Sequence, residues 1–229
     1  YLGLSALSDA FIIAFKLPNS LRKIFAEGAL SSAFIPTFVG LMRHDRKAEA
    51  NSLMTLSFLF FEGILLLLCL LVFLFPQNVI YLFAPGFSTE QMTYAIHYLK
   101  ILISFIVFIS SSALLAVALN SVNHFLIPAA GSVILNIGFI TALLLGIRYN
   151  LPVGFLCYAI LCSGLLLFGA HLCAYFYFHF SFAPLQKSIL PDFKKLLIKF
   201  APVCFCMSIT EVNLALDTAF SSYLQAGTV

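Results

Sequence analysis

The stretch Asp9–Pro36 reads DAFIIAFKLPNSLRKIFAEGALSSAFIP and has the apolar character of a membrane-spanning helix. It nevertheless carries five charged side chains, which are Asp9, Lys16, Arg22, Lys23 and Glu27. A charge at the centre of a bilayer costs roughly 3–15 kcal/mol, so these side chains are not expected to face lipid. We expect them to line a polar cavity inside a helix bundle. The adjacent cations Arg22 and Lys23 indicate an anionic ligand.

The composition of the whole chain sets its class. Hydrophobic residues make up 62% and charged residues 9%, and the mean hydropathy is +1.06. Soluble domains carry about 25% charged residues, so the sequence predicts an all-α, polytopic membrane helix bundle. The net charge of +3 is too small and too dispersed for nucleic-acid binding. Cys204 and Cys206 form a C-x-C, but no second pair or histidine cluster completes a site, so we expect no metal and no cofactor.

Apolar windows of about 20 residues, the length that crosses a bilayer, predict about six transmembrane helices in a single domain, 1–229. The expected ranges are approximately 5–42, 52–75, 93–119, 128–147, 153–178 and 191–224. The first range is too long for one straight span. Pro18 lies inside it and predicts a kink or break near Leu17–Asn19.

The charged connections predict the orientation in the membrane. Arg43–Lys47 and Lys187–Lys199 hold most of the loop cations and, with six alternating crossings, fall on the same side. The opposite loops, Gln77–Met92 and Arg148–Pro152, carry few charges. The positive-inside rule therefore makes Arg43–Lys47 and Lys187–Lys199 cytoplasmic. The first helix would then be entered from the outer side, and we expect a further helix to precede it.

Helical geometry arranges the charges of the first helix. On an ideal helix four of them fall within about 40° of one line: Asp9, Lys16, Lys23 and Glu27. Arg22 lies about 100° from Lys23. A break at Pro18 changes the register, so the spacing alone does not decide whether Arg22 or Lys23 faces the cavity. Pro18 and Asn19 also matter because a broken intramembrane helix frees backbone groups that line substrate sites in transporters.

Two simpler interpretations of these charges remain open. Lys23 and Glu27, four residues apart, suit an intrahelical ion pair, whereas Asp9 and Lys16, seven apart, are too distant for easy contact. Alternatively, Asp9 lies at one membrane interface while Arg22 and Lys23 extend toward the other.

The last helix carries two further acids, Glu211 and Asp217. They need not share a helix face, and they are candidates for lining a polar cavity or for proton or sodium coupling. The chain has no Gly-rich phosphate loop and no Ser/His/Asp constellation. The sequence therefore supplies no nucleophile and base for an intramembrane hydrolase, and a transporter rather than an enzyme is expected.

Ser8–Pro36 contains the pattern S-D-A-F-x-x-A-F-x-L-P-N-x-L-R-x-x-F-A-E-G-A-x-S-x-A-F-I-P. This pattern closely resembles the MurJ/MviN family of lipid II flippases, in the multidrug/oligosaccharidyl-lipid/polysaccharide exporter superfamily. Three more segments agree with that family: APGF at Ala84–Phe87, N-x-x-x-x-F-x-I-P-A at Asn120–Ala129, and D-T-x-x-x-S-x-L-x-x-G at Asp217–Gly227. The resemblance covers essentially the whole chain.

The resemblance implies a fold of fourteen helices in two lobes around a central cavity. It implies alternating-access transport of undecaprenyl-pyrophosphate-linked peptidoglycan precursor across the bacterial inner membrane, for cell-wall biosynthesis. The expected partners are that precursor and membrane lipids, together with cell-wall synthesis proteins. Two other functions stay open: export of polysaccharide-linked lipids or drugs, and a non-transporting membrane scaffold in which the charges are structural pairs.

The resemblance also assigns residues. Asp9, Arg22 and Glu27 match charged positions of the family's second helix, and Pro18 and Asn19 match its break. Arg22 is the residue that the resemblance implies to face the cavity and bind the pyrophosphate. The chain resembles helices two to seven and lacks the family's first helix and C-terminal lobe, so we expect that it is a fragment that does not transport alone.

Overall fold

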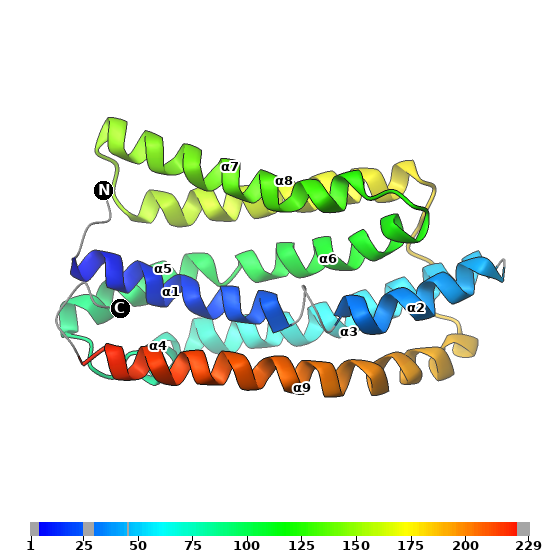
Figure 1. Ribbon diagram of the computed structural model, residues 1–229, viewed down its shortest axis with the longest axis horizontal. Helices are drawn as coiled ribbons and strands as arrows, with labels where there is room; N and C mark the ends of the chain where they lie inside the picture. Colours follow the sequence, from blue (N-terminus) through cyan, green and yellow to red (C-terminus); the bar gives the residue numbers. More distant parts are fainter. Residues whose placement is uncertain (1–4, 25–29, 45, 224–229) are drawn as a thin grey trace.

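The computed structural model describes residues 5–24, 30–44 and 46–223, and in these ranges it consists of helices joined by turns, without strands (Figure 1). The helices are α1 (Ala6–Arg22), α2 (Leu30–Arg43), α3 (Lys47–Leu74), α4 (Pro76–Phe83), α5 (Thr89–Leu102), α6 (Phe105–Ser121), α7 (Leu126–Tyr149), α8 (Gly154–Tyr177), the 3₁₀ turn η2 (Lys187–Ile189) and α9 (Leu190–Ser221). The predicted all-α helix bundle is confirmed.

Five helical segments of the described chain are long and apolar enough to cross a membrane. They are Lys47–Leu74, Thr89–Ser121, Leu126–Tyr149, Gly154–Tyr177 and Lys187–Ser221. Their outward faces are apolar, as on α3, where Leu66, Leu67 and Leu70 are each more than half exposed. Such continuous apolar surface suits lipid rather than water, and the protein is a multi-pass membrane protein.

The first expected helix has a different internal structure from the one predicted. α1 continues through the buried Pro18 and ends only at Arg22, so the helix is not broken at Leu17–Asn19, and the alternative, a kink there, stays a prediction. Proline removes one helical hydrogen bond but does not end a helix that packing holds on both sides. Here the preceding turn is held by the fully buried Ala14. A π-helical turn follows at Lys23–Ile24, residues 25–29 lie outside the described chain, and α2 begins at Leu30.

Two further features were not predicted. α4 occupies the first part of the expected loop Gln77–Met92 and begins at Pro76. Proline is favoured at the first position of a helix, because the N–H that it lacks would have no helical partner there. The expected span 93–119 is divided into α5 and α6 by a turn at Ile103–Ser104. The run Ala84–Phe87 forms a turn, in which the Phe87 N–H donates to the Ala84 carbonyl at 3.3 Å.

The buried side chains form two clusters, one toward each end of the bundle. The first joins α1, α5, α7 and α8 and includes Phe11, Tyr98 and Leu156. The second joins α2, α3, α6 and α9 and includes Phe38 and Met54. In Figure 1, α1 and α2 follow one another along the long axis, as α5 and α6 do. α1 and α2 therefore contribute to different clusters, whereas α6 contributes Phe105 and Ile109 to the first cluster and Leu114 and Val117 to the second.

The charged connections meet at one end of the bundle. Arg46 lies 4.0 Å from Asp192 at the start of α9, and the Gln186 N–H donates to Ser52 Oγ at 2.9 Å. The opposite connections, which include Gln77–Met92 and Arg148–Pro152, lie at the other end (Figure 1). The arrangement matches the alternating topology expected from the sequence.

Candidate functional site

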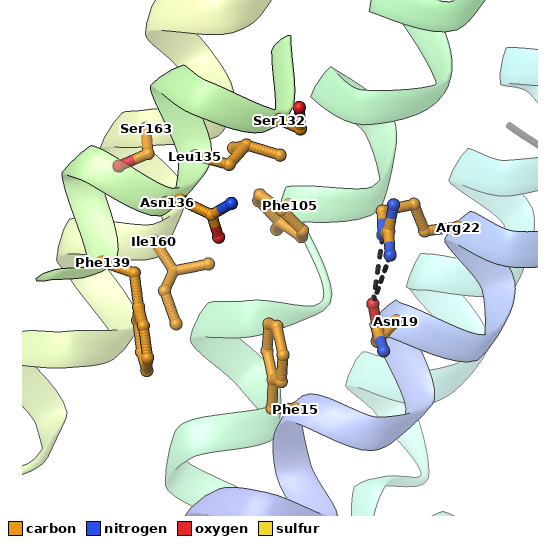
Figure 2. Close-up of a pocket in the computed structure, with 10 residues that line it drawn as sticks. All are labelled: Phe15, Asn19, Arg22, Phe105, Ser132, Leu135, Asn136, Phe139, Ile160 and Ser163. Atoms are coloured by element: carbon orange, nitrogen blue, oxygen red, sulfur yellow. Dashed lines mark hydrogen bonds between the residues drawn. The ribbon is translucent and has the colours of Figure 1, made fainter. Parts of the chain in front are cut away.

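Arg22 is the last residue of α1, and its side chain is held by the preceding turn of the same helix. Its Nε and Nη2 atoms donate to Asn19 Oδ1 at 3.0 and 2.9 Å. Two donors of a rigid guanidinium on one acceptor fix the plane of the group as well as its position. Figure 2 shows the guanidinium folded back over Asn19, on the side of α1 that faces Phe105.

Arg22 and Asn19 line a pocket of about 390 Å³ between α1, the start of α6, α7 and α8. Three more polar side chains line it, and these are Ser132 and Asn136 of α7 and Ser163 of α8. Its remaining walls are apolar: Phe15, Phe105, Leu135, Phe139 and Ile160. In Figure 2 the Asn136 amide points inward between Phe105 and Ile160. A mainly apolar pocket with a few convergent polar groups is the usual form of a ligand site.

A second pocket, of about 350 Å³, adjoins the first and shares Arg22, Ser132 and Leu135 with it. It continues along α6 and α8 to Asn120 and to His171, whose Nδ1 lies 2.9 Å from the Leu167 carbonyl oxygen. Among the described residues that line either pocket there is no Asp or Glu, and Arg22 is the side chain with a permanent charge. The joined pockets therefore favour an anion.

The opposite side of α1 faces α9, and its polar side chains bond there. Lys23 Nζ lies 3.2 Å from Glu211 Oε1, and Ser20 Oγ donates to Glu211 Oε2 at 2.6 Å. One turn earlier along α1, Lys16 Nζ donates to the Leu214 carbonyl at 3.2 Å. The Glu211 side chain is 10% exposed and that of Lys23 is 38% exposed. Arg22 and Lys23 are adjacent in sequence but serve different sides of α1.

Comparisons with known proteins bear on the family of the chain. A family model described as "Lipid II flippase MurJ" matches residues 1–229. The chain belongs to the MurJ family. It is 31% identical over 237 residues to a probable lipid II flippase MurJ of Buchnera aphidicola, covering 99% of this chain and 45% of that relative. It is 29% identical over 234 residues to the lipid II flippase MurJ of Burkholderia cenocepacia, again covering 99% of this chain and 45% of the relative.

A solved MurJ structure matches the described fold. The structure of lipid II flippase MurJ in an inward closed conformation aligns with a TM-score of 0.80 and 29% identity, covering 99% of this chain and 47% of that one. The chain thus spans about half the length of the curated MurJ relatives that it matches. The predicted family is confirmed, and the family consists of membrane transporters rather than enzymes.

The structure separates the charged residues that the sequence grouped on one stripe. Asp9 is buried, and its Oδ2 accepts from Gln91 Nε2 of α5 at 3.3 Å. Lys16 instead faces α9, where Glu211 and Asp217 attract it electrostatically. Glu27 lies outside the described residues, so its expected role stays a prediction.

Sequence reasoning did not single out several residues of the site. Ser20 was missed, although a small polar side chain on the charged helix is a weak signal for a cross-helix hydrogen bond. Ser132 and Ser163 were also missed, because single serines are common in membrane helices and their sequence context is apolar. Asn136 is a stronger sequence signal for a polar pocket than these serines, because an amide in the middle of a membrane-spanning helix needs hydrogen-bond partners.

Reversing charges between α1 and α9 tests whether Lys23 and Glu211 hold these helices together. In the whole protein, K23E places two carboxylates together and should lower the free energy of unfolding by roughly 1–3 kcal/mol. The double variant K23E/E211K restores the attraction and should recover most of that loss. Thermal unfolding followed by circular dichroism in detergent measures both. Additive losses in the double variant would show that the two side chains do not interact.

Proposed function

We propose that this chain is the substrate-binding part of a flippase that moves lipid-linked peptidoglycan precursor across the bacterial inner membrane. In this proposal two lobes alternate access to a central cavity, as the family resemblance implies. The transported lipid is the undecaprenyl-pyrophosphate-linked precursor known as lipid II. No bond is made or broken, because the protein only lowers the cost of moving a charged, sugar-bearing head group through an apolar barrier.

The observation that carries the proposal is the position of Arg22. A permanently charged guanidinium at the junction of two pockets, without an acidic side chain among their described lining residues, suits a pyrophosphate. Sites for cationic drugs need acidic groups, so the same observation disfavours a drug exporter. A volume of about 390 Å³ lies at the small end for ligand pockets and suits the pyrophosphate end of the lipid rather than its whole head group.

The other candidate residues divide by their contacts. Asn19 positions Arg22, and we assign it to the binding site. Lys16, Lys23 and Glu211 join α1 to α9, and we assign them to the packing of these helices rather than to direct binding. Asp217 supports Lys16 electrostatically. Of the two acids, Glu211 is the better candidate for coupling, because its protonation would weaken the α1–α9 contact.

The proposal includes an orientation and its partners. The end that carries Arg43–Lys47 and Lys187–Lys199 faces the cytoplasm. The excess of cations at that end supports this orientation, and the proximity of Arg46 to Asp192 supports the placement of both loops at the same end. The precursor would be taken up on that side, so cell-wall synthesis proteins that make it are the protein partners that the proposal implies.

Translocation by the full-length protein is the direct test. Reconstituted in vesicles, it should carry a fluorescent lipid-linked pyrophosphate precursor from one leaflet to the other. Unlabelled precursor should compete, whereas an uncharged polyprenol and a lipophilic cationic drug should not. Leaflet position is measured by quenching with a reagent that does not cross the membrane.

The outcomes separate the alternatives. Transport of the cationic drug with no movement of the precursor would establish a drug exporter instead of a flippase. Vesicles that move neither substrate, from protein that is folded and correctly oriented, would support a membrane scaffold.

A further inference from the structure

Glu62 is an acidic residue in the middle of a membrane-spanning helix. It lies within one turn of the midpoint of α3, which runs from Lys47 to Leu74. Glu62 is 7% exposed, and neither of its carboxyl oxygens has a hydrogen-bond partner. Buried polar groups are nearly always hydrogen-bonded, so an unpartnered carboxyl at this depth calls for an explanation.

Glu62 shares the face of α3 that packs against α6. Leu65, Cys69 and Val72 continue that face at helical spacing, and Leu65 and Val72 are buried. Across the interface, Ser110 and Ser111 of α6 are the polar side chains close to the Glu62 carboxyl. The Ser110 hydroxyl is itself buried and without a hydrogen-bond partner. Two unpartnered polar groups therefore face one another between two apolar helices.

No cation on the neighbouring helices balances a charge on Glu62. In the described residues of α2, α4, α6 and η2, the charged side chains are Arg43, at the end of α2, and the exposed Lys187 of η2. The start of α9 carries Asp192, Lys194, Lys195 and Lys199. Asp192 pairs with Lys195 and lies near Arg46, and Lys194 and Lys199 are exposed. Arg46 lies about 24 Å along the helix axis from Glu62, at 1.5 Å per residue.

The α9 side and α3 itself complete the surroundings. On the α9 side, α3 presents Phe60 and Phe61, which contact Phe193 and Phe200. Glu211 of α9 is occupied by Lys23, and the titratable group that interacts with Glu62 is the Cys69 thiol on α3 itself. Within the part of the chain that the structure describes, an ionised Glu62 would thus have no counter-ion.

We propose that Glu62, Ser110 and Ser111 form a proton-binding site within the membrane, in which Glu62 is held as the neutral acid. A proton removes the uncompensated charge and converts the carboxyl into a donor for a serine hydroxyl, so that both unpartnered groups gain a bond through a small rotation. Two serine hydroxyls and one carboxyl are too few oxygens for a metal cation that takes six or more ligands. The proton would leave when α3 and α6 separate enough to admit water. This site is independent of Arg22 and of the proposed substrate.

Infrared spectroscopy of the full-length protein tests the proposal. At neutral pH the wild-type protein should show the carbonyl band of a protonated carboxylic acid, which E62Q removes. Glu90, exposed at the start of α5, provides the matched control, and E90Q should leave the band unchanged. The double variant S110A/S111A should keep the band but shift it, because the acid loses its hydrogen-bond partners.

A chemical probe gives a second readout that needs no variant. An apolar carbodiimide reacts with protonated carboxyls in lipid, so it should label Glu62 in the wild-type protein at neutral pH, with labelling that declines as the pH rises. Mass spectrometry of the digested protein locates the label.

Three results would overturn the proposal. One is a carboxylic-acid band that persists in E62Q, and another is a carboxylate band alone in the wild-type protein at neutral pH. The third is protection of Glu62 from the carbodiimide by sodium at constant pH, which would make the site one for a metal cation. None of these measurements depends on transport, so the site and the flippase proposal can fail separately.

Discussion

Replacement of Arg22 by alanine in the full-length protein is expected to reduce precursor translocation about 100-fold or more. The guanidinium supplies the permanent charge of the joined pockets, and charge-assisted hydrogen bonds to a phosphate are each worth about 1.5–3 kcal/mol. Losing two such bonds removes enough binding energy for the stated effect. The measurement is the initial rate of leaflet exchange of the fluorescent precursor, with growth of cells depleted of their own flippase as a second readout.

The adjacent Lys23 makes a matched control, because it carries the same charge on the same turn of helix. Lys23 bonds to Glu211 on the other side of α1, so K23A should retain translocation within about threefold, as expected for a partly exposed ion pair. R22K keeps the charge but loses the planar fork and should lie between the two. Full activity in R22A together with loss in K23A would reverse the assignment of these residues.

The main helices could be predicted because the sequence signal for them is physical and local. Apolar windows located α3, α7, α8 and α9 to within a few residues. The division of 93–119 at Ile103–Ser104 has no such signal, because the run around it contains neither proline nor glycine. The turn contacts α3, where Cys69 Sγ donates to the Ile103 carbonyl at 3.5 Å. Contacts between distant segments determine such features.

The same contrast between local signals and distant contacts applies to the candidate site. The charges of Asp9–Pro36 identified this stretch as a candidate site, because charged side chains are costly in lipid. The spacing could not distinguish Arg22 from Lys23, because the answer depends on where α1 ends and on which helices lie beside it. Lys23 points toward α9 because it bonds to Glu211, which is 188 residues away in the sequence. The helix break was expected at Pro18 from a rule about proline, whereas buried packing carries α1 to Arg22.

Gly86 gives the largest expected effect on stability. It lies in the turn Ala84–Phe87, and its N–H donates to Ser222 Oγ at the end of α9 at 3.1 Å. A Cβ at this position would lie 2.4 Å from the Ser222 carbonyl oxygen and 2.9 Å from the Tyr223 nitrogen. These are backbone atoms, so a rotamer change cannot relieve the overlap. G86A must therefore push the end of α9 away from the turn.

In the full-length protein, G86A should lower the free energy of unfolding by about 2–3 kcal/mol, the upper part of the usual cost of overpacking. Thermal unfolding in detergent measures it. G63A is the matched control, because nothing lies within 4 Å of a Cβ at that exposed position of α3, and it should be neutral or stabilising by up to about 1 kcal/mol.

The contacts that a displaced α9 would lose are few and can be named. Phe193, Leu196, Phe200 and Thr218 are its buried side chains in the described chain, and much of its remaining surface is apolar and exposed. The variant S222A separates the clash from the hydrogen bond: alone it should cost about 1 kcal/mol, and it should not rescue G86A. Rescue would mean that the Ser222 side chain, rather than the backbone, opposes a larger residue. The turn would then adapt to alanine, and glycine would not be required to position α9 beside α1.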